Sequence, residues 1–303
     1  MAACEEAPAS KKPKLDVDEV PIDRVLEVAK RAAREAGSAI RKTWYETTTA
    51  VKDTKSCSVD LVTETDQFCE EIVMKLIKEA FPEHEIIGEE TAGAEKYNLT
   101  DAPTWTIDPI DGTTNFVHRY PQSCVIIAFF VGREVRCGVT YDPIADELFY
   151  ATRGGGAMLE SPNRVGPISP SGTTTIARAL VNLEVGYGRD EGAISGVSTW
   201  LTDILRKGVR SVRMGGSTGM NLAYIACGRL DAAMEDGSWE LGRGPKIWDF
   251  SAGALILAEA GGVTRDLASV DGGPRLDYMG RSYFAAATPA LADEFWKVVK
   301  KAA

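Results

Sequence analysis

The sequence has 303 residues, of which 44% are hydrophobic, and its formal net charge at pH 7 is −10. A chain of this length and apolar content can bury a large core, which argues against a short or disordered interaction module and favours one large domain or two closely joined subdomains. The excess of acidic residues argues against partners such as nucleic acid or an anionic membrane.

The first 20 residues are expected to form a disordered tail, because they are rich in charged residues and contain no apolar segment. This tail does not have the pattern of a secretory signal, and no stretch of the chain approaches the length needed to span a membrane. The run Lys11-Lys12-Pro13-Lys14 could act as a nuclear address, but a solvated tail is the simpler interpretation.

The cysteines are scattered along the chain without a CxxC pair or a regular spacing. They are Cys4, Cys57, Cys69, Cys124, Cys137 and Cys227. This pattern indicates neither a zinc cluster nor a disulfide scaffold. Reduced thiols in a cytoplasmic protein fit it best.

Apolar residues at helical spacing predict a first helix over residues 25–40. A second helix is expected to begin near residues 63–66 and to stop before Pro82. The strands that follow are expected to be short apolar or alternating runs bounded by turn residues. Their expected ranges are 85–87, 104–107, 123–131, 134–141, 148–151 and 157–160.

Beyond about residue 162, strands and helices are expected to alternate. The expected strands are at 179–183, 209–214 and 230–234, and the expected helices are at 197–207, 217–227, 248–260 and 291–302. This order predicts a mixed α and β protein with helices layered against two sheets. We expect a tail over 1–20, an N-terminal α+β subdomain over 21–161, and a C-terminal α/β subdomain over 162–303.

The most informative segment is 105–116, Trp-Thr-Ile-Asp-Pro-Ile-Asp-Gly-Thr-Thr-Asn-Phe, in which Asp108 and Asp111 bracket a proline turn after an apolar strand. Such a turn can aim both carboxylates at one point and add the carbonyl oxygen of Ile110, and Mg²⁺ prefers oxygen ligands. Gly112 permits close backbone approach, and the groups after it can face a phosphate at a helix N-terminus. An ordinary Asp-Pro and Asp-Gly turn is the competing interpretation.

Acidic residues also lie at the ends of two other expected elements. Glu89 and Glu90 come directly after the strand expected at 85–87, so one of them could add a third carboxylate to the same crevice. Asp249 lies in the first turn of an apolar helix, where the helix dipole favours an anion. Taken singly, the glutamates could belong to a solvated turn and Asp249 could be a helix cap.

With these motifs in this order, the chain resembles the inositol monophosphatase family, within the wider group of Mg²⁺-dependent, Li⁺-sensitive sugar phosphatases. The resemblance runs from about Ile22 to the end of the chain. The segments that carry it are Lys55 with 59–66, 88–90, 108–116, 216–221, and 248–249 with 258–262. It implies a layered αβαβα sandwich of the inositol monophosphatase and fructose-1,6-bisphosphatase type, and a homodimer.

The resemblance also implies a set of metal ligands. Glu89, Asp108 and the carbonyl of Ile110 would hold a first Mg²⁺, Asp108, Asp111 and Asp249 a second, and Glu89 with waters a weaker third. Four carboxylates contribute −4 and three Mg²⁺ ions +6, and the surplus of +2 matches a phosphate monoester dianion. Without cations these carboxylates would repel one another, so such a cluster makes sense chiefly as a cation site.

The catalytic and substrate-binding roles are likewise implied by the resemblance. Thr113 paired with Asp66 would orient and deprotonate the attacking water, and Lys55 would lie near that water and the phosphate. The amides of Gly112 and Thr113 would bind the phosphate. The residues expected to line the polyol pocket are Asp111, Gly216, Thr218, Glu235 and Asp249.

The expected function is therefore that of a Mg²⁺-dependent phosphomonoesterase, which hydrolyses inositol monophosphate by a metal-activated water and forms no covalent intermediate. The chain has only two histidines, His84 and His118, and no cysteine lies in a phosphate-cradling loop, so a covalent nucleophile is poorly provided for. A catalytically silent, metal-binding interaction protein is the alternative from another class.

The family pattern differs here in one respect that bears on the substrate. Glu235 and Asp249 are fourteen residues apart, whereas close relatives have about seven between the corresponding residues. The extra residues, within 236–247, are expected to form a loop beside the pocket, and Glu240 is a rival to Glu235 for the sugar contact. Alternative substrates are therefore galactose 1-phosphate, histidinol phosphate and 3′-phosphoadenosine 5′-phosphate.

Overall fold

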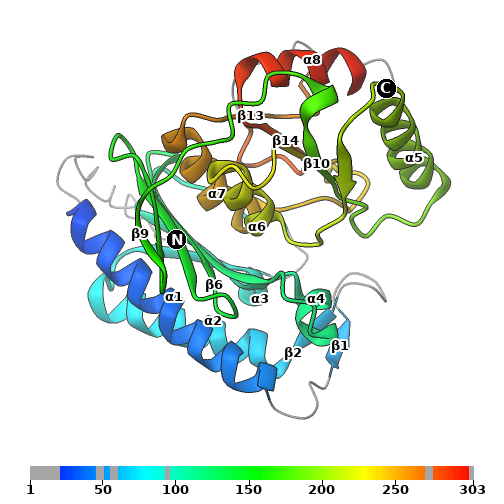
Figure 1. Cartoon of the computed structure of the whole chain (residues 1–303). Coiled ribbons are helices and arrows are strands. Elements are labelled where there is room, and N and C mark those ends of the chain that lie inside the picture. Colours follow the sequence, from blue (N-terminus) through cyan, green and yellow to red (C-terminus); the bar gives the residue numbers. More distant parts are fainter. Residues whose placement is uncertain (1–20, 46–50, 55–60, 93–95, 270–275, 300–303) are drawn as a thin grey trace, which may run out of the picture.

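The computed structural model describes residues 21–45, 51–54, 61–92, 96–269 and 276–299 (Figure 1). Its larger sheet has seven strands, and the strands follow one another in space as they do in the chain. They are β3 (Glu85–Gly88), β4 (Thr104–Asp111), β5 (Cys124–Val131), β6 (Glu134–Asp142), β7 (Glu147–Thr152), β8 (Ala157–Ser161) and β9 (Arg164–Pro167). β3 and β4 are parallel, and all later neighbours are antiparallel.

A second sheet has five strands. In spatial order they are β11 (Ser211–Arg213), β10 (Leu180–Leu183), β12 (Ala232–Glu235), β14 (Tyr283–Ala286) and β13 (Val263–Arg265). The first three are parallel, and β14 runs antiparallel to both of its neighbours. A separate antiparallel pair is formed by β1 (Val51–Thr54) and β2 (Leu61–Thr63).

The helices form three layers around the two sheets (Figure 1). α1 (Ile22–Tyr45) and α2 (Glu64–Ala80) pack on the larger sheet, and α6 (Thr218–Ala226) and α7 (Ile247–Ala260) contact both sheets. α5 (Glu191–Arg206) and α8 (Pro289–Val299) lie beyond the smaller sheet. Short helical segments are α3 (Glu89–Ala92), α4 (Thr113–His118) and η2 (Ile176–Arg178). The result is the layered αβαβα arrangement expected from the sequence.

The sequence of each helix explains its layer. α7 is buried from Ile247 to Leu257 with the exception of Asp249, as expected for a helix that is apolar on every side and lies between two sheets. Its Gly253 packs so closely on α6 that an added Cβ would lie 2.6 Å from the Cβ of Leu222. α1 instead buries a single stripe against the larger sheet and exposes its other face.

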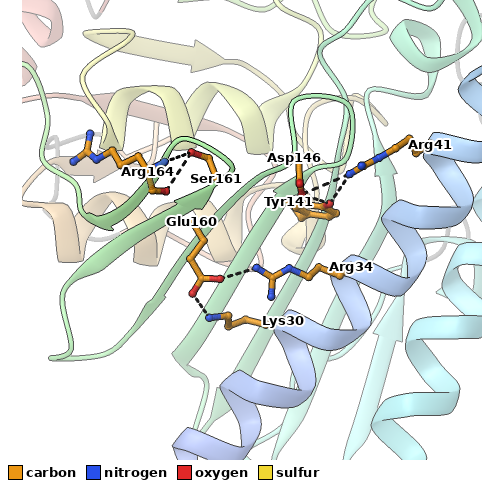
Figure 2. Close-up of polar contacts among 8 residues, drawn as sticks. All are labelled: Lys30, Arg34, Arg41, Tyr141, Asp146, Glu160, Ser161 and Arg164. Carbon is orange, nitrogen blue, oxygen red and sulfur yellow. Dashed lines mark hydrogen bonds and ion pairs between the residues drawn. The ribbon is translucent and has the colours of Figure 1, made fainter.

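Polar contacts fasten α1 to the larger sheet (Figure 2). Lys30 and Arg34 both bind the carboxylate of Glu160 on β8, with 2.6 Å between Arg34 Nη2 and Glu160 Oε2. About two helical turns after Arg34, Arg41 Nη2 donates to Tyr141 OH at 2.9 Å, and Tyr141 OH donates to Asp146 Oδ1 at 2.7 Å. The charged side chains of α1 that face the sheet are thus paired with groups of the sheet.

The structure differs from the expected elements at several boundaries. The segment from Asp108 to Asp111, expected as a turn, continues β4, and its pairing with β5 shifts register because Pro109 has no N–H for the ladder. α5 begins six residues earlier than expected, because Asp190 caps it by accepting the N–H of Ala193. α3 and β9, of four residues each, were not expected, and neither were β13 and β14 in the smaller sheet. The division of the chain at residue 161 stays a prediction.

Candidate active site

Three aspartates meet where β4 ends and α7 begins. Suitable carboxylate oxygens of Asp108, Asp111 and Asp249 all lie within 4.8 Å of one another. Asp108 and Asp111 are 2% and 8% exposed, so little water screens them. Burial, followed by the charge of Asp249, raises the pKa of Asp111, and burial, followed by the charge of Glu89, raises that of Asp249. A group of close, buried carboxylates that oppose each other's ionisation is a fit site for a cation.

Each aspartate is held by hydrogen bonds from neighbouring backbone or side chains. Asp111 Oδ2 accepts from the Ser217 hydroxyl and from the N–H of Gly219, both at 2.6 Å, at the start of α6. Asp249 Oδ2 accepts the N–H of Lys246 at 2.5 Å, which forms part of a capping box at the start of α7. These bonds fix the carboxylates before any cation arrives.

The hydroxyl of Thr113 lies beside a further buried carboxylate, that of Asp66. Its Oγ1 is 3.2 Å from Asp66 Oδ1 and 3.0 Å from the carbonyl oxygen of Ile110. Asp66 is fully buried at the start of α2, where its other oxygen accepts the N–H of Thr63 at 2.8 Å. Asp66 is thereby oriented toward Thr113, as a base that acts through a hydroxyl requires.

Gly112 joins β4 to α4 in a conformation that favours glycine. Its φ is +84°, and an added Cβ would lie 2.9 Å from the carbonyl oxygen of Gln122 and 3.0 Å from that of Gly216. The absence of a side chain therefore lets two other backbone segments approach this turn. Gly112 and Thr113 both line the cavity above the aspartates.

A cavity of about 830 Å³ opens above the aspartates and reaches from the larger sheet to the smaller one. Ten of the residues expected to act in the site line it, namely Glu89, Asp108, Ile110, Asp111, Gly112, Thr113, Gly216, Thr218, Glu235 and Asp249. Asp66 is not among the lining residues but contacts Thr113, which is. Lys55, expected near the phosphate, lies outside the described residues.

Two further acidic side chains, those of Glu184 and Glu235, line the cavity on the side of the smaller sheet. Glu235, at the end of β12, accepts the Thr218 hydroxyl at 3.1 Å through Oε2. Burial, followed by the charge of Glu184, raises the pKa of Glu235 well above its usual range. Glu240 is exposed and is not among the residues that line the cavity.

The extra segment 236–246 forms part of the cavity wall. Trp239 within it packs edge-on against Tyr97, lies under the guanidinium of Arg281, and donates Nε1–H to the carbonyl of Met279 at 2.8 Å. Trp239 and Lys246 both line the cavity. The segment was expected as a loop beside the pocket, and the structure places it there.

Sequence reasoning missed two cavity residues that hold other parts of the site in place. Glu184 follows β10 and accepts three hydrogen bonds at Oε1, from the side-chain amides of Asn182 and Asn221 at 2.7 Å and from the N–H of Gly216 at 2.8 Å. Its position directly after a strand, like that of Glu89, was the available signal. Ser217 could have been noticed as a helix cap, but its contact with Asp111 depends on the tertiary fold.

The fold and the carboxylate cluster together are those of a metal-dependent phosphatase. Residues 22–302 match the model of the inositol monophosphatase family, and the chain belongs to that family. It is 43% identical over 246 residues to inositol monophosphatase 1 of Solanum lycopersicum, which covers 81% of this chain and 85% of that protein. It is 36% identical over 273 residues to inositol monophosphatase 2 of Homo sapiens, covering 90% and 89% of the two chains.

Solved structures agree with this assignment. The extragenic suppressor protein SuhB from Bartonella henselae superposes with a TM-score of 0.76 at 26% identity, over 92% of this chain and 99% of that one. The inositol monophosphatase from Anabaena gives a TM-score of 0.73 at 28% identity, over 93% and 97%. Among the described residues, no helix has both the length and the apolar content to cross a membrane.

Proposed function

We propose that this protein is a phosphoric monoester hydrolase that releases phosphate from inositol monophosphate. The observation that carries the proposal is the convergence of Asp108, Asp111 and Asp249 within 4.8 Å in the same cavity as the Thr113 hydroxyl. The inositol monophosphatases to which the chain is similar support the substrate class.

We further propose that the carboxylates hold Mg²⁺. The donors are hard oxygens, which fit this ion, and their mutual repulsion is relieved only by positive charge. Glu89, Asp108 and the carbonyl of Ile110 would form one site, and Asp108, Asp111 and Asp249 a second, with two to three ions in all. When bound, the ions supply an activated water and neutralise charge on the phosphate and the leaving oxygen.

The protein's own groups position the reactants. Thr113 Oγ1 accepts a hydrogen bond from the attacking water, and the proton passes to Asp66 Oδ1, 3.2 Å from that hydroxyl. The amides of Gly112 and Thr113 donate to the phosphate oxygens. Burial raises the pKa of Glu235, which favours a protonated carboxyl group that can both donate to and accept from the hydroxyls of the substrate.

Finer properties belong to the same proposal. We propose inhibition by Li⁺ and a homodimer, both supported by resemblance to the family, and a cytoplasmic location, supported by the free thiols of Cys69, Cys124, Cys137 and Cys227. Lys55, which lies outside the described residues, would assist at the phosphate. Because the extra residues 236–246 change the wall of the cavity, the alternative substrates are galactose 1-phosphate, histidinol phosphate and 3′-phosphoadenosine 5′-phosphate.

One experiment tests the proposal. Phosphate release is measured across inositol, sugar, histidinol and nucleotide phosphates, with and without Mg²⁺, Li⁺ and a chelator. We expect the fastest release from inositol monophosphate, dependence on Mg²⁺ and inhibition by Li⁺. Full activity in the presence of the chelator would refute the metal mechanism. Folded protein that binds cations but cleaves no substrate would favour the silent interaction protein instead.

A further inference from the structure

Glu70 on α2 is a buried carboxylate with none of the roles described above. Glu70 is only 2% exposed to solvent. Oε2 accepts the N–H of Glu90 at 2.8 Å, and Oε1 accepts the N–H of Thr91 at 2.9 Å. Both amides lie in the first turn of α3, where backbone N–H groups have no partner within the helix. The carboxylate therefore clamps the turn that begins with Glu89.

The same carboxylate packs on the residue that precedes Glu89. A Cβ added to Gly88 would lie 2.6 Å from both Cδ and Oε2 of Glu70 and 2.7 Å from Oε1. Glu89 is thus flanked by a glycine on which Glu70 rests and by two amides that Glu70 binds. Its backbone has little freedom to move while this contact persists.

α2 connects two parts of the site, the pair of Asp66 and Thr113 and the turn that begins with Glu89. Asp66 and Glu70 are four residues apart, so their side chains lie on one face of the helix. Asp66 contacts Thr113, and Glu70 holds the turn of Glu89. A single rigid helix therefore sets the separation between the base that acts on water and the glutamate at the cations.

We propose that Glu70 is a positioning residue, which fixes Glu89 for cation binding. The inference rests on the proposed metal-dependent function. α3 has only four residues and cannot hold its own conformation. Without the clamp, Glu89 would have to be ordered when a cation binds, and the entropy lost in that step would weaken binding. Loss of comparable outer contacts in metal sites lowers metal affinity by roughly 10- to 100-fold.

The test is Glu70→Gln, which places the NH₂ of a carboxamide against one of the two backbone N–H donors. Mn²⁺ binding is measured by electron paramagnetic resonance, and the Mg²⁺ concentration for half-maximal phosphate release is measured separately. We expect the dissociation constant for Mn²⁺ and the Mg²⁺ midpoint to rise roughly 10- to 100-fold. The turnover number at saturating Mg²⁺ should stay within about threefold of wild type, because Thr113 and Asp66 remain in place.

Glu259→Gln is the matched control. Glu259 on α7 also accepts two backbone N–H groups with its two oxygens, those of Gly154 at 2.8 Å and Gly156 at 3.0 Å, and it is not among the residues that line the cavity. We expect this variant to lose a similar amount of stability while its cation affinity is unchanged. Equal weakening of Mn²⁺ binding in both variants would overturn the proposal, because it would reveal a general loss of stability.

A double-mutant cycle with Glu89→Gln separates positioning from other effects. If Glu70 acts through Glu89, Glu70→Gln should weaken Mn²⁺ binding in the wild-type background and change it little in Glu89→Gln. Equal effects in both backgrounds would contradict the proposal. Glu70→Asp, which keeps the charge and can keep one hydrogen bond, should be intermediate and serves if Glu70→Gln does not fold.

Failure of this inference is distinguishable from failure of the proposed function. If wild-type protein binds no Mn²⁺ and releases no phosphate, the metal-dependent function itself is wrong. If wild-type protein does both and Glu70→Gln equals it in Mn²⁺ affinity, only the role of Glu70 is refuted.

Discussion

Asp111 is anchored by residues far away in the chain. Ser217 and Gly219, which donate to its Oδ2, lie 106 and 108 positions further on. Cys124 Sγ lies 3.7 Å from the same oxygen, and its thiol pKa is raised well above its usual range, chiefly by burial and next by Asp111. These neighbours supply donors and neutral bulk but no positive charge, which fits the proposal that a bound cation balances the charge of the carboxylates.

Replacing one aspartate by its isosteric amide should therefore abolish most activity. We expect Asp249→Asn to lower kcat/KM by roughly 10³-fold, equivalent to about 4 kcal/mol of transition-state stabilisation, because a ligand to the second cation is lost. Steady-state phosphate release measures this. Asp190→Asn is the control, because Asp190 also starts a helix but is not among the cavity residues. Wild-type turnover in Asp249→Asn would contradict the ligand assignment.

Glu235 should respond differently to the same type of change. Burial raises the pKa of Glu235 and so favours its protonated form, and Glu235→Gln has the shape of that form and no charge. We expect KM to change by less than about threefold in Glu235→Gln and to rise about fivefold in Glu235→Ala, which loses a hydrogen bond worth about 1 kcal/mol. A large rise of KM in both variants would indicate that the ionised form binds the substrate.

At the scale of elements, the join between α2 and β3 contains a titratable group. The ring of His84 stacks between Phe81 and Phe129, with centroids 4.6 and 5.2 Å away, and its Nδ1 accepts the indole N–H of Trp105 at 3.0 Å. Burial, followed by the charge of Lys78, lowers the pKa of His84 to about 4. The folded protein thus holds this ring neutral at pH values where the unfolded chain would protonate it.

This contact predicts a loss of stability in mild acid. Between pH 6.5 and 4 the unfolded chain binds more protons than the folded protein, so the free energy of unfolding falls as the pH falls through that window. From pH 7.5 to 5 we expect His84 to contribute a loss of about 1–2 kcal/mol. Urea unfolding at both pH values measures it. His84→Gln keeps an acceptor for Trp105 and should flatten the difference, and an unchanged difference would exclude His84 as its source.

Several elements of the site could be predicted from the sequence, because their signals are local. The segment from Asp108 to Thr113 and the start of α7 combine an apolar run with acidic residues at its end, and the structure places both at the cavity. The clamp from Glu70 to the amides of α3 has no local signal. It depends on how α2 packs beside β3, and hydrophobic periodicity does not predict the distance between Glu70 and the amides of α3.

At the scale of the whole molecule, the site is built from both sheets. β4 contributes Asp108 and Asp111, β12 contributes Glu235, and Asp249 comes from a helix that contacts both sheets. The number and order of layers could be predicted, because alternating elements and two-sided apolar helices leave few alternatives. The wall at 236–246 could be foreseen only as an extra length of chain, since its course is set by the contacts of Trp239.

Cation binding should therefore stabilise the entire protein. A ligand that binds only the folded state adds about 2.7 kcal/mol at one hundred times its dissociation constant. We expect Mg²⁺ to raise the thermal unfolding midpoint by several degrees, and the rise should be smaller in Asp249→Asn. Scanning calorimetry measures the shift, with KCl of equal ionic strength as the control. An equal rise in KCl would show that general screening, and not the site, is responsible.

The place of α7 also has a consequence during synthesis. This helix carries Asp249 and is packed between two sheets, one of which is completed by strands on either side of α7 in the chain. A growing polypeptide that ends before α7 lacks one of the clustered aspartates and the layer that supports it. Fragments of the chain that end before Ile247 should consequently release no phosphate from phosphate esters, because they lack Asp249.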